Sequence, residues 1–216
     1  MTTIEILKGA KSAWKSLSQL SEENKNTVLL SMAEKLREHC DAVLDANKHD
    51  IEKSRGIISD VMLDRLSLTK ERVFAMADGI LDVAKLPDPI GKVLDEHTRK
   101  DGLLIKKVSV PIGVIAIIYE SRPNVTSDAA ALSFKSGNAC VLRGGKEAFN
   151  SANAIVTALR EALFENGIPK EMISLIEDTT RESAKEIMTA NGLVDLLIPR
   201  GGHGLIAACV ENATVP

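Results

Sequence analysis

The stretch VIAIIYESRPNVTSDAAALSFKSGNACVLRGG, residues 114–145, decides the fold. It holds two short apolar runs, 114–119 and 139–142, on either side of a helical pattern that Gly137 ends. Strands that are apolar on both faces and alternate with helices are typical of a parallel sheet covered on both sides. The stretch therefore predicts a strand, a helix and a second, parallel strand.

The same alternation continues along the chain. Apolar runs recur at 173–176 and 194–198, and Gly167 and Gly192 end the helical patterns that precede them. Residues 111–216 are therefore predicted to form βαβ repeats in an open, parallel, doubly wound sheet, which is an α/β fold.

The residues before this region follow two other patterns. Residues 1–90 are predicted to be helical, because apolar residues recur at helical spacing behind capping residues such as Ser21 and Thr69. The proline-containing sequence LPDP at 86–89 ends that region. In residues 91–110 an Asp101-Gly102 turn separates two runs that can form strands, which predicts a β-ribbon.

Length, composition and net charge exclude several classes of function. The chain has 216 residues, 44% of them apolar and 26% charged, as in a globular protein with one sizeable core. A net charge of −3 argues against nucleic acid as a partner. There is no secretory signal and no apolar stretch of membrane-spanning length, so we expect a cytoplasmic protein without membrane contact. Three cysteines without CxxC spacing, and histidines without ligand spacing, predict no metal site.

Four strand-to-helix loops carry the candidate site: residues 121–124, 143–146, 178–180 and 199–203. In an open parallel sheet such loops meet at the carboxyl edge, where ligands bind. Three of them contain a cation, and two contain Gly-Gly before a helix, where a ligand can approach backbone N–H groups. One such loop alone is more often structural, but together they predict a phosphate-bearing ligand. Walker A, GxGxxG, GxSxG and HExxH motifs are missing.

Longer strings carry a resemblance to a known family. IYESRPNVTSDAAALSFKSGNACVLRGGKEA at 118–148 and DLLIPRGGHGL at 195–205 resemble the gamma-glutamyl phosphate reductases of the aldehyde dehydrogenase superfamily, as do MLDRLSLT at 62–69 and VPIGVIAIIYE at 110–120. The resemblance implies an aldehyde-dehydrogenase-like fold and NADPH-dependent reduction of L-glutamyl 5-phosphate to glutamate 5-semialdehyde, with release of phosphate, in proline biosynthesis. In that chemistry a cysteine thiolate displaces phosphate and hydride reduces the resulting thioester.

The resemblance also assigns residues. Arg143 and Lys146, with Gly144 and Gly145 between them, match positions at the adenosine ribose, and two cations there suit the 2′-phosphate of NADP(H). Arg200, Gly201 and Gly202 match the loop that meets the pyrophosphate. Asn124 matches the asparagine that stabilises the oxyanion, and Arg122 matches a position facing the phosphate or carboxylate of the substrate.

The chain departs from the family pattern in its cysteines. The family nucleophile lies beyond residue 216, and Cys40, Cys140 and Cys209 are interpreted as buried or helical residues. We therefore expect 1–216 to be a partial NADP-binding domain, a fragment that lacks the catalytic-cysteine domain and is inactive alone. The intact protein is expected to be a homo-oligomer, with 91–110 as its arm, and to be functionally coupled to glutamate 5-kinase. Two alternatives stay open: a stand-alone nucleotide- or phosphate-binding module, and a relative acting on another acyl phosphate or aldehyde.

Overall fold

The computed structural model describes residues 1–17, 20–120 and 122–216. Its first part is helical as predicted: α1 (Thr3–Leu17), α2 (Glu22–Glu38), α3 (Cys40–Ser54), α4 (Asp60–Leu66) and α5 (Lys70–Lys85). Both predicted caps are confirmed, because the side chains of Ser21 and Thr69 accept hydrogen bonds from the backbone N–H groups of Asn24 and Arg72.

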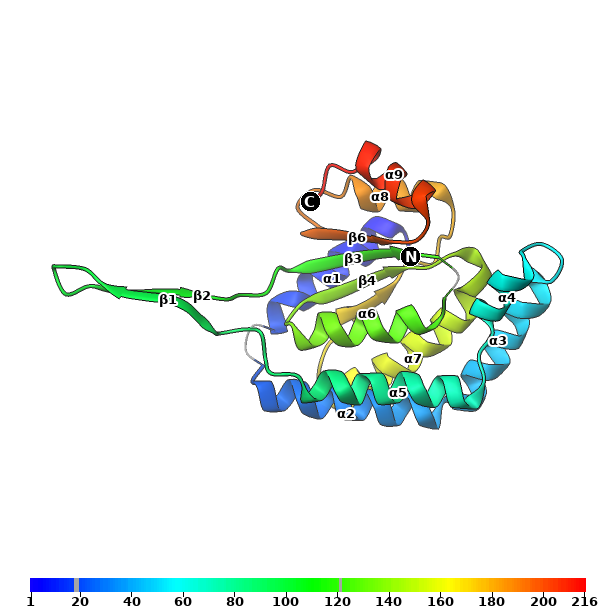
Figure 1. Ribbon diagram of the computed structural model, residues 1–216, viewed down its shortest axis with the longest axis horizontal. Coiled ribbons are helices and arrows are strands. Elements are labelled where there is room, and N and C mark those ends of the chain that lie inside the picture. Colours follow the sequence, from blue (N-terminus) through cyan, green and yellow to red (C-terminus); the bar gives the residue numbers. More distant parts are fainter. Residues whose placement is uncertain (18–19, 121) are drawn as a thin grey trace.

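A two-stranded ribbon projects from this body (Figure 1). Strands β1 (Val93–Thr98) and β2 (Leu104–Val108) pair antiparallel, and every residue of both strands is exposed. The turn between them contains Gly102 with φ +87°, a backbone conformation that glycine adopts without steric cost. The predicted ribbon and its turn are therefore confirmed.

The central sheet has four parallel strands in the order β5-β4-β3-β6. They are β3 (Val114–Tyr119), β4 (Ala139–Arg143), β5 (Ile173–Leu175) and β6 (Leu196–Arg200). The chain moves outward from β3 to β4 and β5 and then returns to the other side of β3. The predicted doubly wound topology is thus confirmed, with its switch point between β3 and β6.

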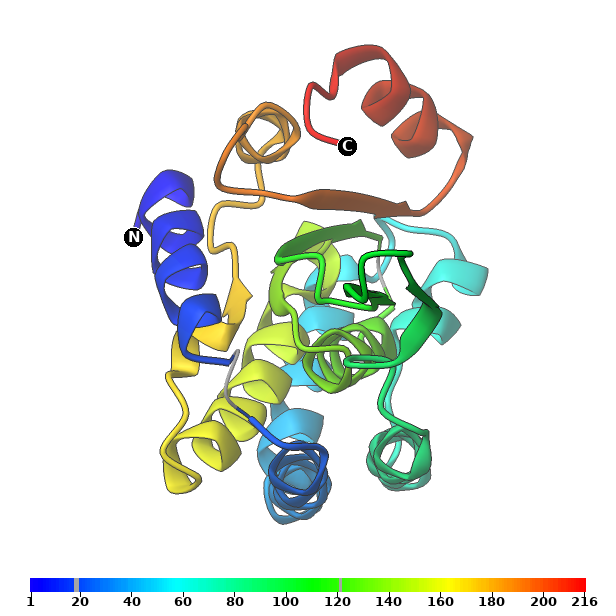
Figure 2. The ribbon, with the colours of Figure 1, turned by 90° about the vertical axis from the view of Figure 1, so that its left-hand side faces the viewer.

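Helices cover the sheet in layers (Figures 1 and 2). The helices that connect the strands are α6 (Asn124–Lys135), α7 (Phe149–Glu165), α8 (Arg181–Met188) and α9 (His203–Asn212), with short 3₁₀ turns η1 (Lys146–Ala148) and η2 (Lys170–Met172). Helices α6 and α7 pack on one face, α1 packs on β4 and β5 from the other, and α9 packs on β6. Helices α2, α3 and α5 form an outer layer against α6 and α7, so both parts of the chain share one core.

The last strand differs from its predicted position. It spans Leu196–Arg200 rather than 194–198, because Asp195 serves as a junction instead of a strand residue. Its Oδ2 accepts a hydrogen bond of 2.8 Å from the Val114 N–H at the start of β3. The same carboxylate pairs with Lys11 Nζ at 2.6 Å, which ties α1 to the start of β6. A Cβ on Gly113 would lie 2.7 Å from Cγ of Asp195, so this junction needs glycine there.

A second junction joins the outer helices to the sheet layer. Asp50 of α3 is only 2% exposed, and its Oδ2 accepts hydrogen bonds from Ser151 N at 2.7 Å and Ser151 Oγ at 2.6 Å. Asp50 Oδ1 accepts another from Asn150 Nδ2 at 2.6 Å. A carboxylate at the start of α7 satisfies N–H groups that the helix itself leaves free. No helix within the described residues combines the length and apolar character that a membrane crossing needs.

Candidate nucleotide and substrate site

The switch point places two loops side by side at the carboxyl edge of the sheet. Tyr119 and Arg200 are register partners at the ends of β3 and β6, so Glu120 and Gly201 leave the sheet together. Glu120 Oε1 accepts a hydrogen bond of 2.8 Å from the Gly202 N–H, at the start of α9. The sequence predicted an anion at this helix start, and in the structure the Glu120 carboxylate is the group that takes this N–H.

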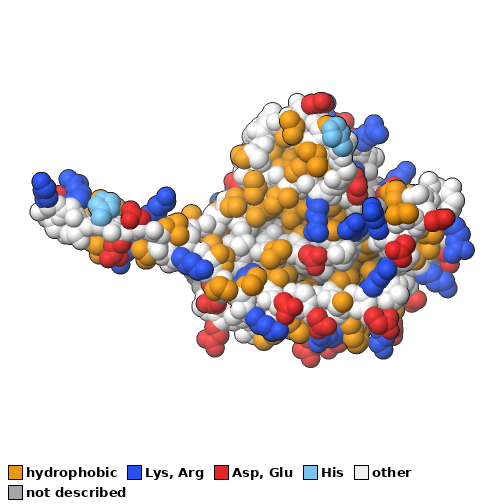
Figure 3. All heavy atoms as spheres, viewed as in Figure 1, with side chains coloured by type: hydrophobic (Ala, Val, Ile, Leu, Met, Phe, Trp, Pro, Cys, Tyr) orange, Lys and Arg blue, Asp and Glu red, His pale blue; other side chains and the backbone are white. Residues whose placement is uncertain are grey.

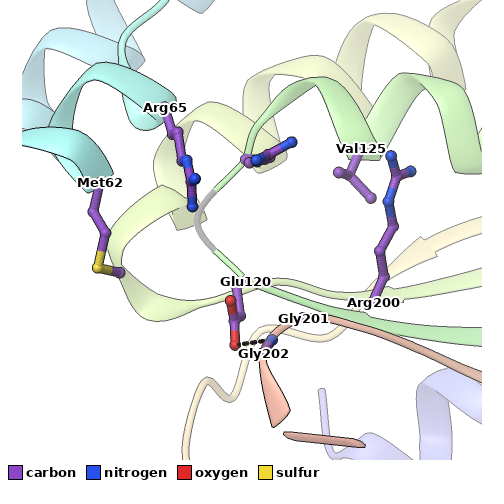
Figure 4. Close-up of a pocket in the computed structure, with 8 residues that line it drawn as sticks. Met62, Arg65, Glu120, Val125, Arg200, Gly201 and Gly202 are labelled. Atoms are coloured by element: carbon purple, nitrogen blue, oxygen red, sulfur yellow. Dashed lines mark hydrogen bonds between the residues drawn. The ribbon is translucent and has the colours of Figure 1, made fainter.

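A cavity of about 390 Å³ opens beside these loops. It is lined by three arginines, Arg65, Arg122 and Arg200, together with Glu120 (Figure 4). In Figure 4, Arg65 descends from α4 and Arg200 rises from the end of β6 beside Val125. Lys and Arg side chains also gather over this end of β3, between α6 and α9, on the surface in Figure 3. The predicted residues Arg122 and Arg200 therefore share one cationic cavity, whereas Ser121 of the same loop lies outside the described residues.

Arg143 ends β4 and is held by the loop before α8. Its Nη2 donates hydrogen bonds to the backbone oxygens of Thr179 at 2.6 Å and Thr180 at 2.8 Å. That loop is fixed in turn by Asp178, whose Oδ1 accepts from the Thr180 N–H at 2.8 Å. Burial lowers the pKa of Arg143, and the charges of Asp178 and Glu147 oppose this shift. The Nε of Arg143 is buried without a hydrogen-bond partner among the described residues.

Arg143 also lines a cavity of about 520 Å³ that α8 and α9 border. Arg181 and Lys185 of α8 line the same cavity, and their spacing of four residues places both on one helix face. Apolar side chains complete the wall, among them Met188 and Leu205. Sequence reasoning missed Arg181 and Lys185, although their spacing of four residues directly after the loop at 178–180 contained the signal.

The residues that follow Arg143 in the loop at 143–146 lie away from the cavity that Arg143 lines. Lys146 is exposed and lines a separate cavity of about 210 Å³ with Asp50 and Lys53 of α3. Gly144 packs closely on Tyr119, since a Cβ at Gly144 would lie 3.2 Å from the ring Cζ. The structure thus supplies a packing reason for Gly144, and it does not place Lys146 in the cavity that Arg143 lines.

Asn124 begins α6 and faces another cavity of about 440 Å³. Its Nδ2 donates a hydrogen bond of 3.3 Å to Oδ2 of Asp128, one turn further along the helix. Burial raises the pKa of Asp128, while the charge of Arg200 and the hydrogen bond from Asn124 lower it. An amide carries two N–H donors, so this arrangement leaves Asn124 with a second donor for a ligand.

Cys140 and Cys209 are buried, as the sequence interpretation expected, and Cys40, interpreted as a helix residue, begins α3 and is buried as well. Burial raises the pKa of Cys140 to about 12. Burial likewise raises the pKa values of Cys40 and Cys209. The reactive form of cysteine is the thiolate, and a raised pKa disfavours it. None of the three thiols therefore has the environment of a nucleophile.

Comparison with known proteins extends this picture. The chain is 57% identical to the gamma-glutamyl phosphate reductase of Streptococcus suis (strain 05ZYH33), with 100% of this chain and 53% of that protein covered. It is 51% identical to the enzyme of the same name from Carboxydothermus hydrogenoformans, with 99% and 52% covered. The chain thus spans about half the length of these curated relatives.

Solved structures agree with the sequence comparison. The crystal structure of gamma-glutamyl phosphate reductase from Thermotoga maritima superposes with a TM-score of 0.98 at 44% identity, covering 100% of this chain and 52% of that one. The corresponding enzyme from Saccharomyces cerevisiae superposes with a TM-score of 0.91 at 32% identity, covering 100% and 55%. The model of the aldehyde dehydrogenase family matches residues 2–198. This chain therefore belongs to the aldehyde dehydrogenase family.

Proposed function

We propose that this chain forms the cofactor-binding part of a gamma-glutamyl phosphate reductase, which reduces L-glutamyl 5-phosphate to L-glutamate 5-semialdehyde and releases phosphate. Relatives of that name at 57% and 51% identity support the activity. The observation that carries the proposal is the cavity that α8 and α9 border, where three cations surround an apolar wall. A nucleotide has the complementary character, with a flat base and several phosphate charges.

The residues present fit a nicotinamide dinucleotide. The buried Nε of Arg143 lacks a partner among the described residues, and an anionic oxygen would satisfy it. Arg181 and Lys185 add two exposed positive charges at the same cavity. Three cations suit the extra 2′-phosphate of NADP(H), which NAD(H) does not carry. We therefore propose NADP(H) as the cofactor, with Lys146, Gly144 and Gly145 contributing from the neighbouring loop.

The glycines after β6 would serve the pyrophosphate. Gly201 and Gly202 expose backbone at the start of α9, and Arg200 adds a positive charge beside them. Glu120 occupies the Gly202 N–H, so the bound pyrophosphate would have to share or replace that contact.

On the substrate side, the second N–H of Asn124 would donate to the carbonyl oxygen as negative charge develops there. Arg200 would neutralise the phosphate group of the substrate, and Arg122, which lines the same cavity, would face the phosphate or the carboxylate. When bound, NADPH would supply the hydride for the reduction. The three buried cysteines cannot act as nucleophile, so that group would come from a part of the protein outside these 216 residues.

The ribbon β1-β2 would carry contacts to another copy of the protein. Its exposed apolar residues include Leu94, Leu104 and Val108, which a partner strand or surface could cover. We accordingly propose a homo-oligomer for the intact protein.

The cofactor assignment is tested by titrating the purified chain with NADP⁺ and NAD⁺ in a calorimeter. We expect NADP⁺ to bind more tightly, and Arg181→Ala to weaken NADP⁺ by roughly tenfold while changing NAD⁺ much less. Arg143→Ala should weaken both, and Arg55→Ala, at the exposed residue that follows α3, is the matched control. Equal affinities for both dinucleotides, unchanged by Arg143→Ala, would contradict the proposal.

A further inference from the structure

The cavity of about 440 Å³ lies against the start of α6 and adjoins the cationic cavity at the switch point. Arg65 and Arg122 line both spaces, so the two cavities share a wall. The second cavity also contains Asn124, Asp128 and the apolar side chain of Met76. It brings together residues from α4, α5 and α6 that are far apart in the sequence.

The arginines of this cavity differ in whether their guanidinium groups have hydrogen-bond partners. Arg72 is a structural residue, because its Nη1 donates to the backbone oxygens of Asp64 at 2.8 Å and Ser67 at 2.7 Å. Within the described ranges, the guanidinium groups of Arg65 and Arg122 have no hydrogen bond or ion pair. Two free guanidinium groups that face one space are suited to a carboxylate, which can accept paired hydrogen bonds from each fork.

Asp128 is the opposite charge in the same cavity. It is half-buried, and its only hydrogen bond among the described residues is the long one of 3.3 Å from Asn124. The other carboxylate oxygen, Oδ1, faces Gly79 of α5, where an added Cβ would lie 3.9 Å away. A carboxylate removed from water with so few donors is unfavourable unless a cation compensates it. The charge of Arg200 lowers the pKa of Asp128, but no ion pair joins the two side chains among the described residues, so the carboxylate is complementary to an ammonium group.

We propose that this cavity binds the amino-acid end of the substrate, with Arg65 and Arg122 at its α-carboxylate and Asp128 at its α-ammonium. This inference rests on the proposed function, and it leaves Arg200 and the adjoining cavity for the phosphate end. The arrangement selects an acyl phosphate that carries an α-amino acid over one with a plain carbon chain. Asp128 is a specificity-determining residue, because a substrate without the ammonium leaves its charge unpaired.

The test uses the purified chain and three probes, followed by NMR titration: L-glutamate, glutarate without the amino group, and 4-aminobutanoate without the α-carboxylate. We expect L-glutamate to bind more tightly than either of the others. Asp128→Asn should weaken L-glutamate by roughly tenfold or more and leave glutarate within about twofold. Arg65→Met should weaken L-glutamate and glutarate alike, and Arg55→Met is the control.

Separate outcomes bear on the two proposals. Equal losses for L-glutamate and glutarate in Asp128→Asn would overturn the ammonium assignment, and so would no loss for either. A chain that binds NADP⁺ but shows no binding of L-glutamate would overturn this inference and leave the cofactor assignment intact. Binding of L-glutamate with the expected Asp128 dependence, without binding of NADP⁺, would support the amino-acid site and count against the proposed cofactor.

Discussion

Replacing Gly113 by alanine should be among the most damaging small changes in this chain. Gly113 has φ +134°, a conformation that costs other residues about 1–3 kcal/mol. The new Cβ would also displace the Asp195 carboxylate, which accepts the Val114 N–H at 2.8 Å. Losing a hydrogen bond to a charged group costs about 1.5–3 kcal/mol. We expect Gly113→Ala to lower the free energy of unfolding by about 4 kcal/mol in total.

Urea denaturation followed by circular dichroism measures this cost. Gly56→Ala is the matched control, because Gly56 has φ +77° but no atom within 4 Å of its added Cβ, so it reports backbone strain alone. Adding Asp195→Ala removes the group that collides, so the double variant should lose less than the two single losses together. A Gly113→Ala loss no larger than that of Gly56→Ala, or strict additivity with Asp195→Ala, would refute the reasoning.

Two further predictions concern the buried carboxylate of Asp50 and the half-buried carboxylate of Asp128. Asp50→Ala should lower the free energy of unfolding by about 3 kcal/mol, because it leaves the N–H groups at the start of α7 unpaired, whereas Asp45→Ala on the exposed face of α3 should change it by less than about 0.5 kcal/mol. Replacing Asp128 should have the opposite effect and raise the free energy of unfolding at neutral pH. Burial raises its folded pKa above the ordinary 3.8, so stability falls as pH rises from that value through the raised folded pKa. Asp128→Asn should therefore be more stable than the unsubstituted chain at neutral pH, and this gain in stability should shrink below pH 3.8. Urea titrations at several pH values measure the gain. A gain that stays constant with pH would contradict the raised pKa of Asp128.

Local chemistry explains which parts of the fold could be predicted. The strand at Val114–Tyr119 was recognisable because all six residues are apolar and all six are buried. The Asp101-Gly102 turn and the caps at Ser21 and Thr69 depend on a few neighbouring residues and were found for that reason. The start of β6 was misplaced by two residues, because the role of Asp195 depends on Val114, 81 positions away.

The site was only partly predictable for the same reason. Arg122, Arg143 and Arg200 follow strands, and the rule that ligands bind at the carboxyl edge of a parallel sheet singled them out. Arg65 belongs to the helical region and reaches the cavity only because α4 packs beside the switch point. The string MLDRLSLT at 62–69, which contains Arg65, carries the family resemblance but assigned no role to Arg65. Nothing in the sequence singled out Asp128, and its single long hydrogen bond within the described residues is visible only in three dimensions.

The carbonyl contacts of Arg143 have a consequence for the entropy of binding. A long side chain loses up to about 2 kcal/mol of rotamer freedom when it is fixed in one conformation. Here the Thr179 and Thr180 oxygens fix the guanidinium before any ligand binds. The loss of rotamer freedom is therefore part of the free energy of folding and not of the free energy of binding. An anion that meets Nε would find the side chain already ordered, and its affinity would not be reduced by freezing Arg143.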